Sequence, residues 1–303
     1  MYMDFENFDE SIGVAGYYDF IRKKFFPNSS EFSFDIANFQ AEERYYPKGT
    51  YFSRVRKLTH EKAYDFFCGN INIDDFYPPR AHIIDIPEGR FNRAKKSTFY
   101  LADHPFVAMK ECDIHVGDFF LMSYFSLPRN MCFMHLEDGK DDLSKLLFNL
   151  FKSRDKKFYP VINLIYSDFI NFDKHDGIAY DSIKVNYDHV EINSWGPISS
   201  VVNFAIQNQK IRDFKLEVSW LMYCNEDFKP VEYSIYMPLS GKKRNRISKL
   251  NYRGNKKEYI KKTTEICARL QADSRKGEIL LGKGKLKASN EIPFKIVDKL
   301  PRK

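Results

Sequence analysis

The segment from Ser97 to Cys112 reads STFYLADHPFVAMKEC. Its first part, STFYLA, is rich in β-branched and aromatic residues, which predicts a strand. Asp103 then suits the N-cap of a helix, because its carboxylate can accept from the free N–H groups of the first turn, and Pro105 fits that turn. We therefore expect a helix up to Cys112, with Glu111 near its end. A strand that leads directly into a helix predicts a fold of mixed character.

Elements of both kinds continue on either side of this segment. Residues 1–49 are interpreted as a small extension, mostly helix and loop. Apolar residues that recur every four positions predict a helix, and strict alternation predicts a strand. On this basis we expect strands at Thr50–Arg56, Val116–Phe125, Gly177–Ile183 and Val201–Ile206, a hairpin of Leu216–Cys224 with Val231–Met237, and helices at His60–Phe67, Asp141–Phe151 and Tyr159–Phe172. This irregular mixture predicts an α+β fold rather than a doubly wound sheet.

Charge divides the chain into two parts. Residues 241–303 contain 20 Lys and Arg against 6 Asp and Glu, whereas the whole chain has a net charge of only +7. We therefore expect three units: the extension 1–49, a catalytic domain 50–240 and a basic tail 241–303. The tail is either a solvated arm or a binding surface for nucleic acid or an acidic partner. A helical stripe at Tyr259, Ile266 and Leu270 indicates that part of it docks on the core or on a partner.

The cysteines and histidines do not form a recognisable metal pattern. The five cysteines are scattered and lack CxxC spacing, which argues against a disulfide framework and a zinc site. The chain has no basic and apolar leader and no uncharged apolar run of about 20 residues. We expect a reduced cytoplasmic protein with no metal and no membrane contact, and a homo-oligomer is left open.

Four short motifs stand out together: Arg54 in SRVR, GRFN at Gly89–Asn92, the strand of Tyr100 followed by the helix with Glu111, and GIAYDS at Gly177–Ser182. Each alone has an ordinary structural interpretation. An arginine on a strand usually forms an edge contact, and GRFN could be a simple turn. In this order and spacing the set resembles the RES domain, over about residues 50–206.

The resemblance implies a fold similar to that of ADP-ribosyltransferase toxins and degradation of NAD⁺. NAD⁺ would be the substrate, no cofactor would be needed, and inorganic phosphate could be a co-substrate. Several members of the family are toxins that an antitoxin protein neutralises, so an antitoxin is a further expected partner. A role as a toxin or defence effector would then follow from NAD⁺ depletion.

The residue types of these motifs suit that chemistry. Cleavage of the bond between ribose and nicotinamide leaves a cationic sugar centre, which a carboxylate such as Glu111 stabilises. Arginine forks match the oxygens of a pyrophosphate, and an aromatic wall suits the flat nicotinamide ring. We expect catalytic roles for Glu111, Arg54 and Ser182, and substrate-binding roles for Arg54, Arg90, Asn92, Tyr100, Tyr180 and Ser182.

The acceptor of the ADP-ribosyl group stays open at this point. Water would make the chain a glycohydrolase and phosphate would make it a phosphorylase. Two alternatives are a protein ADP-ribosyltransferase and a catalytically idle RES-like module that binds nucleic acid through the basic tail.

Overall fold

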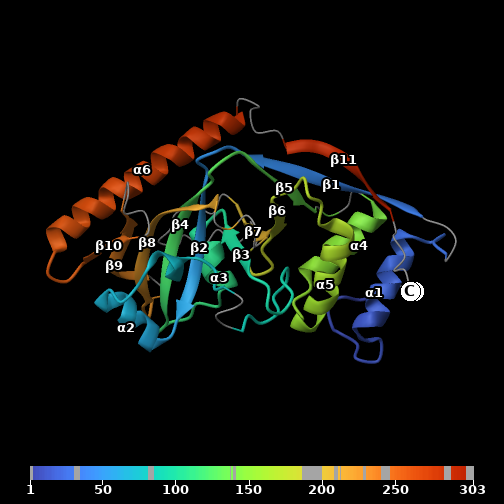
Figure 1. Ribbon diagram of the computed structural model, residues 1–303, viewed down its shortest axis with the longest axis horizontal. Helices are drawn as coiled ribbons and strands as arrows, with labels where there is room; N and C mark the ends of the chain where they lie inside the picture. The colour runs from blue at the N-terminus through green and yellow to red at the C-terminus, as the bar shows by residue number, and fades with distance from the viewer. Residues whose placement is uncertain are drawn as a thin grey trace.

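A single eleven-stranded, mostly antiparallel sheet organises the computed structural model (Figure 1). The structure describes residues 3–30, 35–80, 85–136, 138, 141–185, 200–207, 211, 213–227, 230–239, 246–282 and 288–297, with backbone alone from residue 271 onward. Six helices pack against the sheet, which confirms the predicted α+β class. Similarity to ADP-ribosyltransferases stays a prediction.

The helices and strands have the following bounds. The helices are α1 (Gly13–Phe25), α2 (His60–Cys68), α3 (Pro105–Glu111), α4 (Asp142–Lys152), α5 (Tyr159–Ile165) and α6 (Lys256–Gly282), with short turns η1 (Ile73–Phe76), η2 (Lys156–Phe158) and the π-helical η3 (Tyr166–Ile170). The strands are β1 (Ile36–Tyr46), β2 (Tyr51–Leu58), β3 (Thr98–Ala102), β4 (Phe119–Ser126), β5 (Met131–His135), β6 (Gly177–Asp181), β7 (Val202–Gln207), β8 (Lys215–Cys224), β9 (Pro230–Pro238), β10 (Ile247–Asn251) and β11 (Ala288–Val297).

The strands lie in the order β10-β9-β8-β4-β2-β3-β7-β6-β5-β1-β11. All neighbours are antiparallel except β5 and β6. The two halves of the sheet meet at β2 and β3, which share one residue pair, Ser53 with Ala102. The candidate site residues described below lie on β3, β6 and α3, close to this weak junction.

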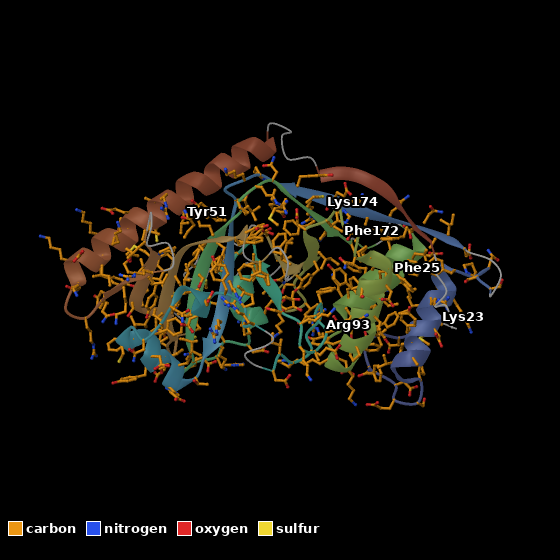
Figure 2. All side chains as sticks on the ribbon, in the orientation of Figure 1. Lys23, Phe25, Tyr51, Arg93, Phe172 and Lys174 are labelled. Atoms are coloured by element: carbon orange, nitrogen blue, oxygen red, sulfur yellow. The ribbon has the colours of Figure 1, made fainter. Side chains whose placement is uncertain are left out.

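Side chains from the two faces of the sheet form separate cores (Figure 2). One face packs against α3 and α6 over β4 and β8, and against α1, α4 and α5 over β1, β5 and β6. Phe25 of α1, for example, contacts Phe39 of β1 and Phe169 of η3 with ring centroids 6.0 and 5.4 Å apart. The other face packs against α2 and η1.

Four strands, β1, β5, β10 and β11, were not predicted. Residues 36–46 were expected as helix or loop but form β1, where Ala37, Phe39 and Ala41 alternate inward. Glu43 continues the buried row, and a charged residue at an inward position conceals the alternation from sequence analysis. The short strand β5 (MCFMH) offers too few residues to show a period.

The region interpreted as a basic tail contains regular elements of the fold. β10 pairs with β9, and β11 pairs with β1. Tyr259 and Ile266 of α6 are buried in the core, so the predicted helical stripe docks on the protein itself. Lys and Arg of 242–245 and 283–287 lie outside the described residues. The boundaries of the three predicted units stay a prediction.

Gly177, in the middle of the sheet, offers a direct test of strand packing. A Cβ atom at this position would lie 2.3 Å from the carbonyl oxygen of Ala205 on β7. Because backbone cannot easily yield, we expect Gly177→Ala to lower the free energy of unfolding by about 3 kcal/mol or more. Gly254→Ala is the control, because open space surrounds it and only its φ of +87° opposes a side chain, at a cost of about 1–2 kcal/mol. Denaturant unfolding of both variants makes the comparison, and equal losses would contradict the packing assignment.

Candidate active site

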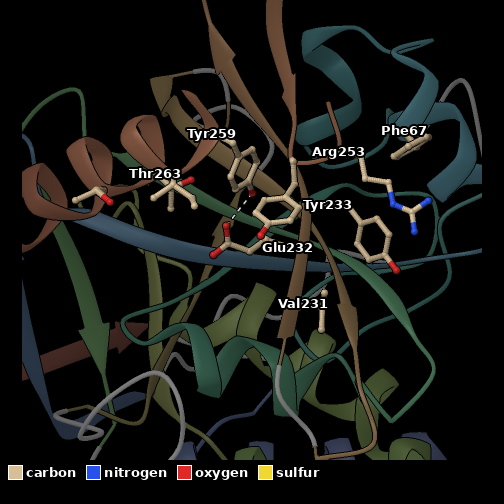
Figure 3. Close-up of a pocket in the computed structure, with 10 residues that line it drawn as sticks. Phe67, Val231, Glu232, Tyr233, Arg253, Tyr259 and Thr263 are labelled. Atoms are coloured by element: carbon tan, nitrogen blue, oxygen red, sulfur yellow. Dashed lines mark hydrogen bonds between the residues drawn. The ribbon is translucent and has the colours of Figure 1, made fainter. Parts of the chain in front are cut away.

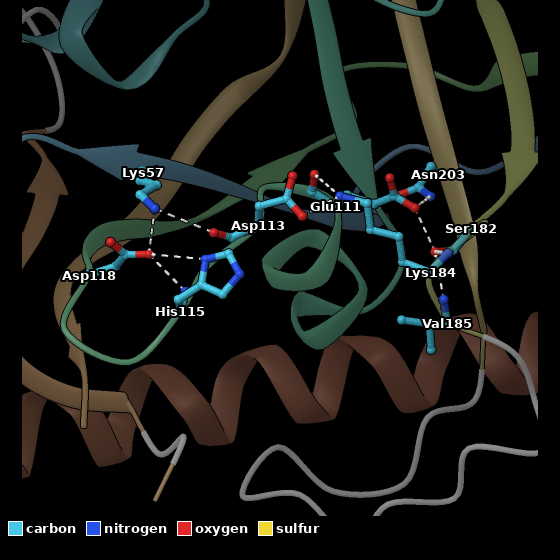
Figure 4. Close-up of polar contacts among 9 residues, drawn as sticks. All are labelled: Lys57, Glu111, Asp113, His115, Asp118, Ser182, Lys184, Val185 and Asn203. Carbon is cyan, nitrogen blue, oxygen red and sulfur yellow. Dashed lines mark hydrogen bonds and ion pairs between the residues drawn. The ribbon is translucent and has the colours of Figure 1, made fainter. Parts of the chain in front are cut away.

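Glu111 lies at the end of α3, where residues of two strands fix its carboxylate (Figure 4). The hydroxyl of Ser182 donates to Glu111 Oε1 at 2.6 Å, and the amide of Asn203 donates to the same oxygen at 3.2 Å. Oε2 accepts no hydrogen bond from any residue that the structure describes. Two donors thus anchor one oxygen of the Glu111 carboxylate.

The sheet determines which side chains meet Glu111. Asn203 pairs with Ala102 of β3 on one side and with Tyr180 of β6 on the other. Paired residues point to the same face of a sheet, so Asn203 and Tyr180 project together beneath α3. Ser182 follows β6 directly, and its Oγ also accepts from the N–H groups of Lys184 and Val185, at 3.1 Å each. These contacts fix the hydroxyl so that its hydrogen points at Glu111.

Lys184 binds two residues at the start of the loop that follows α3. Its ammonium donates to the backbone carbonyl of Glu111 at 3.2 Å and to Asp113 Oδ1 at 2.6 Å. Asp113 has a φ of 49°, a left-handed conformation that Asp tolerates better than most residues. The hydrogen bond from Lys184 lowers the pKa of Asp113 below its ordinary value, so the pair is ionic at neutral pH.

The GRFN motif forms a tight turn next to this cluster. Tyr100 holds the turn, because its hydroxyl accepts from the N–H of Phe91 and donates to Asn92 Oδ1, both at 2.9 Å. Gly89 is required here, since a Cβ atom would lie 2.2 Å from Asn92 Oδ1. Asn163 of α5 donates to the Gly89 carbonyl at 2.8 Å. The motif is therefore a rigid structure whose polar groups satisfy one another.

Tyr180 connects the turn with the carboxylate. Its ring centroid lies 4.8 Å from that of Phe91, and its register places it on the same face as Tyr100 and Asn203. Burial raises the pKa of Tyr180 well above its ordinary value, and the charge of Glu111 adds to the effect. The site thus combines a fixed carboxylate with neutral aromatic rings beside it.

The two predicted phosphate-binding arginines donate to backbone carbonyls in the structure. The Arg90 guanidinium is buried and donates to the carbonyls of Phe151 and Ser153, above the ring of Tyr159. Arg54 donates to the carbonyl of Phe76 at 3.2 Å and lies over the ring of Phe99. Phe76 and Phe99, the two residues that Arg54 contacts, belong to the core on the other face of the sheet. Burial lowers the pKa of Arg54 to about 10, so it stays charged at neutral pH.

Comparison with known proteins identifies this region. Residues 74–210 match the family model of the RES domain. This part of the chain is a RES domain. The matched range includes Arg90, Tyr100, Glu111 and Ser182, whereas Arg54 precedes it. The family is NAD-related and toxin-like. No curated protein and no solved structure matches the chain.

Asn203 is the residue of the RES domain site that sequence analysis missed. It stands in VVNFAI, a run that reads as an apolar strand. Its one signal is that a polar residue interrupts a strand otherwise made of apolar residues, since such a strand is buried on both faces. Only the pairing with β3 and β6 shows that the amide faces Glu111.

Other hollows and charged groups lie apart from the Glu111 cluster. A cavity of about 570 Å³ lies between α6 and β9, lined by Phe67, Tyr233, Arg253 and Tyr259 among others, and shares no residue with the cluster (Figure 3). No helix in the described part of the chain is long and apolar enough to cross a membrane.

One group of side chains could in principle hold a metal ion. Ligand atoms of Glu43, Cys132 and His175 lie within 4.8 Å of one another. The Glu43 carboxylate, however, pairs with Lys174 at 2.5 Å and accepts from Tyr45 at 2.7 Å. A metal ion would have to displace these donors, so the group is a buried ion-pair network.

The turn before α3 differs from the prediction. His104, not Asp103, is the N-cap, and its Nδ1 accepts from the N–H of Phe106. Asp103 is instead turned inward, where its carboxyl accepts from Ser200 Oγ at 2.7 Å. Burial raises the pKa of Asp103 to about 6 from 3.8. The N-cap moved by one residue because the Asp103 N–H pairs with the Val202 carbonyl and extends the ladder.

This raised pKa predicts a pH-dependent stability. The native state favours protonated Asp103, so the stability that this group contributes is complete below pH 3.8 and is lost as the pH rises through about 6. Asp103→Asn cannot ionise. We expect the free energy of unfolding of the variant, relative to that of the wild type, to rise by roughly 3 kcal/mol between pH 4 and pH 8. Denaturant unfolding over this range measures the difference, and a constant difference would contradict the assignment.

Proposed function

We propose that the RES domain cleaves the bond between ribose and nicotinamide in NAD⁺, and that the resulting NAD⁺ depletion is its toxin-like effect. The observation that carries the proposal is the Glu111 carboxylate. Ser182 and Asn203 hold one of its oxygens, while the other accepts no hydrogen bond from the described residues. A carboxylate fixed in this way can face a positive charge that develops at the substrate.

The chemical step needs little besides this charge. The C1′–N1 bond breaks and its electron pair passes to the ring nitrogen, so that the cationic nicotinamide leaves as a neutral molecule. Positive charge develops at C1′, where Glu111 stabilises it. Because the leaving group needs no proton, the site requires no general acid. Water or phosphate then attacks C1′ and releases one proton to solvent.

The aromatic residues beside Glu111 suit the rest of the substrate. Tyr180 offers a ring face next to the carboxylate, and burial keeps its hydroxyl protonated. We assign it to the wall against which nicotinamide or ribose packs. The Tyr100 hydroxyl is engaged in the GRFN turn, so Tyr100 contributes shape rather than a hydrogen bond.

The direct test is incubation of the purified protein with NAD⁺, with and without phosphate, followed by product identification. Free nicotinamide together with ADP-ribose indicates a glycohydrolase. Nicotinamide with ADP-ribose 1″-phosphate, formed only with phosphate, indicates a phosphorylase. If no nicotinamide is released under either condition, the proposed activity is wrong.

Glu111→Gln tests the role of the charge alone. The amide oxygen can still accept from Ser182 and Asn203, so the fold should be kept. We expect NAD⁺ turnover to fall by roughly 10²-fold or more, because the charge opposite the developing cation is lost. Turnover within about three-fold of the wild type, with an unchanged unfolding temperature, would remove Glu111 from this role.

Asn203→Ala tests the positioning of the carboxylate. It removes one of the two donors to Oε1 but leaves the negative charge in place. We expect kcat to fall by roughly 10-fold with a smaller change in KM, since the misplaced carboxylate acts mainly in the transition state. Asn130→Ala, an amide on the β4–β5 turn outside the site, is the control. Equal kinetics for the two variants would show that Asn203 has no positioning role.

A further inference from the structure

The segment Lys152–Lys157, named here the basic segment, joins α4 to η2 and is dense in positive charge. Four of its six residues, KSRDKK, are basic. Its one acid, Asp155, accepts from the N–H groups of Phe8 and Lys157 at 3.0 and 2.9 Å. Because Asp155 is occupied with backbone, it does not form an ion pair with its basic neighbours.

The basic segment borders the Glu111 cluster. Arg154 Nη2 donates to the carbonyl of Ile183 at 3.3 Å. Ile183 stands between Ser182, which binds Glu111, and Lys184, which binds Asp113. Lys156 lies near enough for its charge to help lower the pKa of Asp113. Arg154, Lys156 and Lys184 therefore lie close together beside Ile183 and Asp113.

Two cations of the basic segment are available to a ligand. Arg154 and Lys156 are exposed, and neither forms an ion pair with a carboxylate of the described residues. Arg154 uses one of the five N–H groups of its guanidinium in the contact with Ile183. The other two are engaged, since Lys157 pairs with Glu10 at 2.6 Å and Lys152 lies 4.1 Å above the ring of Phe148.

Arg90 explains why the basic segment has a fixed place. Its buried guanidinium donates to the carbonyls of Phe151 and Ser153, the residues that enter the segment. These donors are turned to backbone and not to solvent. The arginine of the GRFN motif thus holds the segment, and other cations are left to contact a ligand.

We propose that Arg154 and Lys156 bind the pyrophosphate of the dinucleotide substrate. This inference rests on the proposed function for the position of the ribose. When a ribose lies at Glu111, the phosphate attached to that ribose lies on its far side. Arg154 contacts Ile183, the residue after Ser182, so its charge is close to this phosphate. The arginine fork contacts two phosphate oxygens, and the ammonium group of Lys156 adds a point charge.

The hollow on the other side of the basic segment is not part of this site. Its volume is about 830 Å³, and Lys152, Ser153 and Arg154 line one wall. Asp4 and Glu6 line another wall. This hollow shares no residue with the Glu111 cluster, so we place the pyrophosphate on the side of Ile183.

A binding experiment that needs no cleavage tests the proposal. ADP-ribose, which contains the pyrophosphate but no nicotinamide, is titrated calorimetrically into the full-length protein. We expect the double variant Arg154→Ala with Lys156→Ala to raise Kd by at least 10-fold and to weaken the salt dependence. Lys157→Ala removes the same charge from the same segment, but from the ion pair with Glu10, and should change Kd by less than two-fold. Arg154→Gln, a milder change, replaces the double variant if that protein does not fold.

The outcomes separate this proposal from the proposed function. In one outcome the wild type binds ADP-ribose with the expected dependence on Arg154 and Lys156 and yet cleaves no NAD⁺. That result would contradict the proposed activity and support the anion site. Unchanged Kd in the folded double variant, or no ADP-ribose binding by the wild type, overturns the anion site. In a cleaving protein, the same variant should raise KM for NAD⁺ but not for nicotinamide riboside, which has no phosphate.

Discussion

The hydrogen bonds from Ser182 and Asn203 to one oxygen of Glu111 are the constraint on which the site depends. They join Glu111 at the end of α3 to Ser182, directly after β6, and to Asn203 on β7, which lie 71 and 92 positions further along the chain. A carboxylate with two donors on one oxygen loses its rotational freedom. Preorganisation of this kind allows a charge to stabilise a transition state without reorganising first.

The GRFN turn supports that arrangement from the side. Tyr100, Asn92 and Asn163 satisfy the polar groups of the turn, so it presents a rigid aromatic surface to Tyr180. Arg90 holds the segment after α4 by hydrogen bonds to the carbonyls of Phe151 and Ser153. Arg90, Asn92 and Tyr100 thus bond neighbouring parts of the chain, and their contacts with a substrate stay a prediction. Arg90 is buried, and a guanidinium that gives its donors to carbonyls has few left for a phosphate.

The sheet is divided at the same place. β2 and β3 share one residue pair, whereas β4 and β8 pair along their length. Arg54 on β2 lies on the opposite face of the sheet from Tyr100 and Asn203, since its neighbour Ser53 pairs with Ala102 and side chains alternate along a strand. Buried carboxyl groups of the sheet are held by donors. Asp103, after β3, accepts from Ser200, and Glu43, on β1, pairs with Lys174.

The sequence by itself determined the mixed α+β character, most of the central elements and the motifs of the RES domain, because local periodicity and turn chemistry are written in consecutive residues. It also indicated that Tyr259 and Ile266 would dock. It did not show β1, whose buried Glu43 breaks the apolar alternation, or the role of Asn203, which depends on pairing with two other strands. Which arginines are buried and which are exposed was likewise decided by tertiary structure. Arg90 and Arg154 have the same chemistry, and only the carbonyls of Phe151 and Ser153 and the solvent around Arg154 distinguish them.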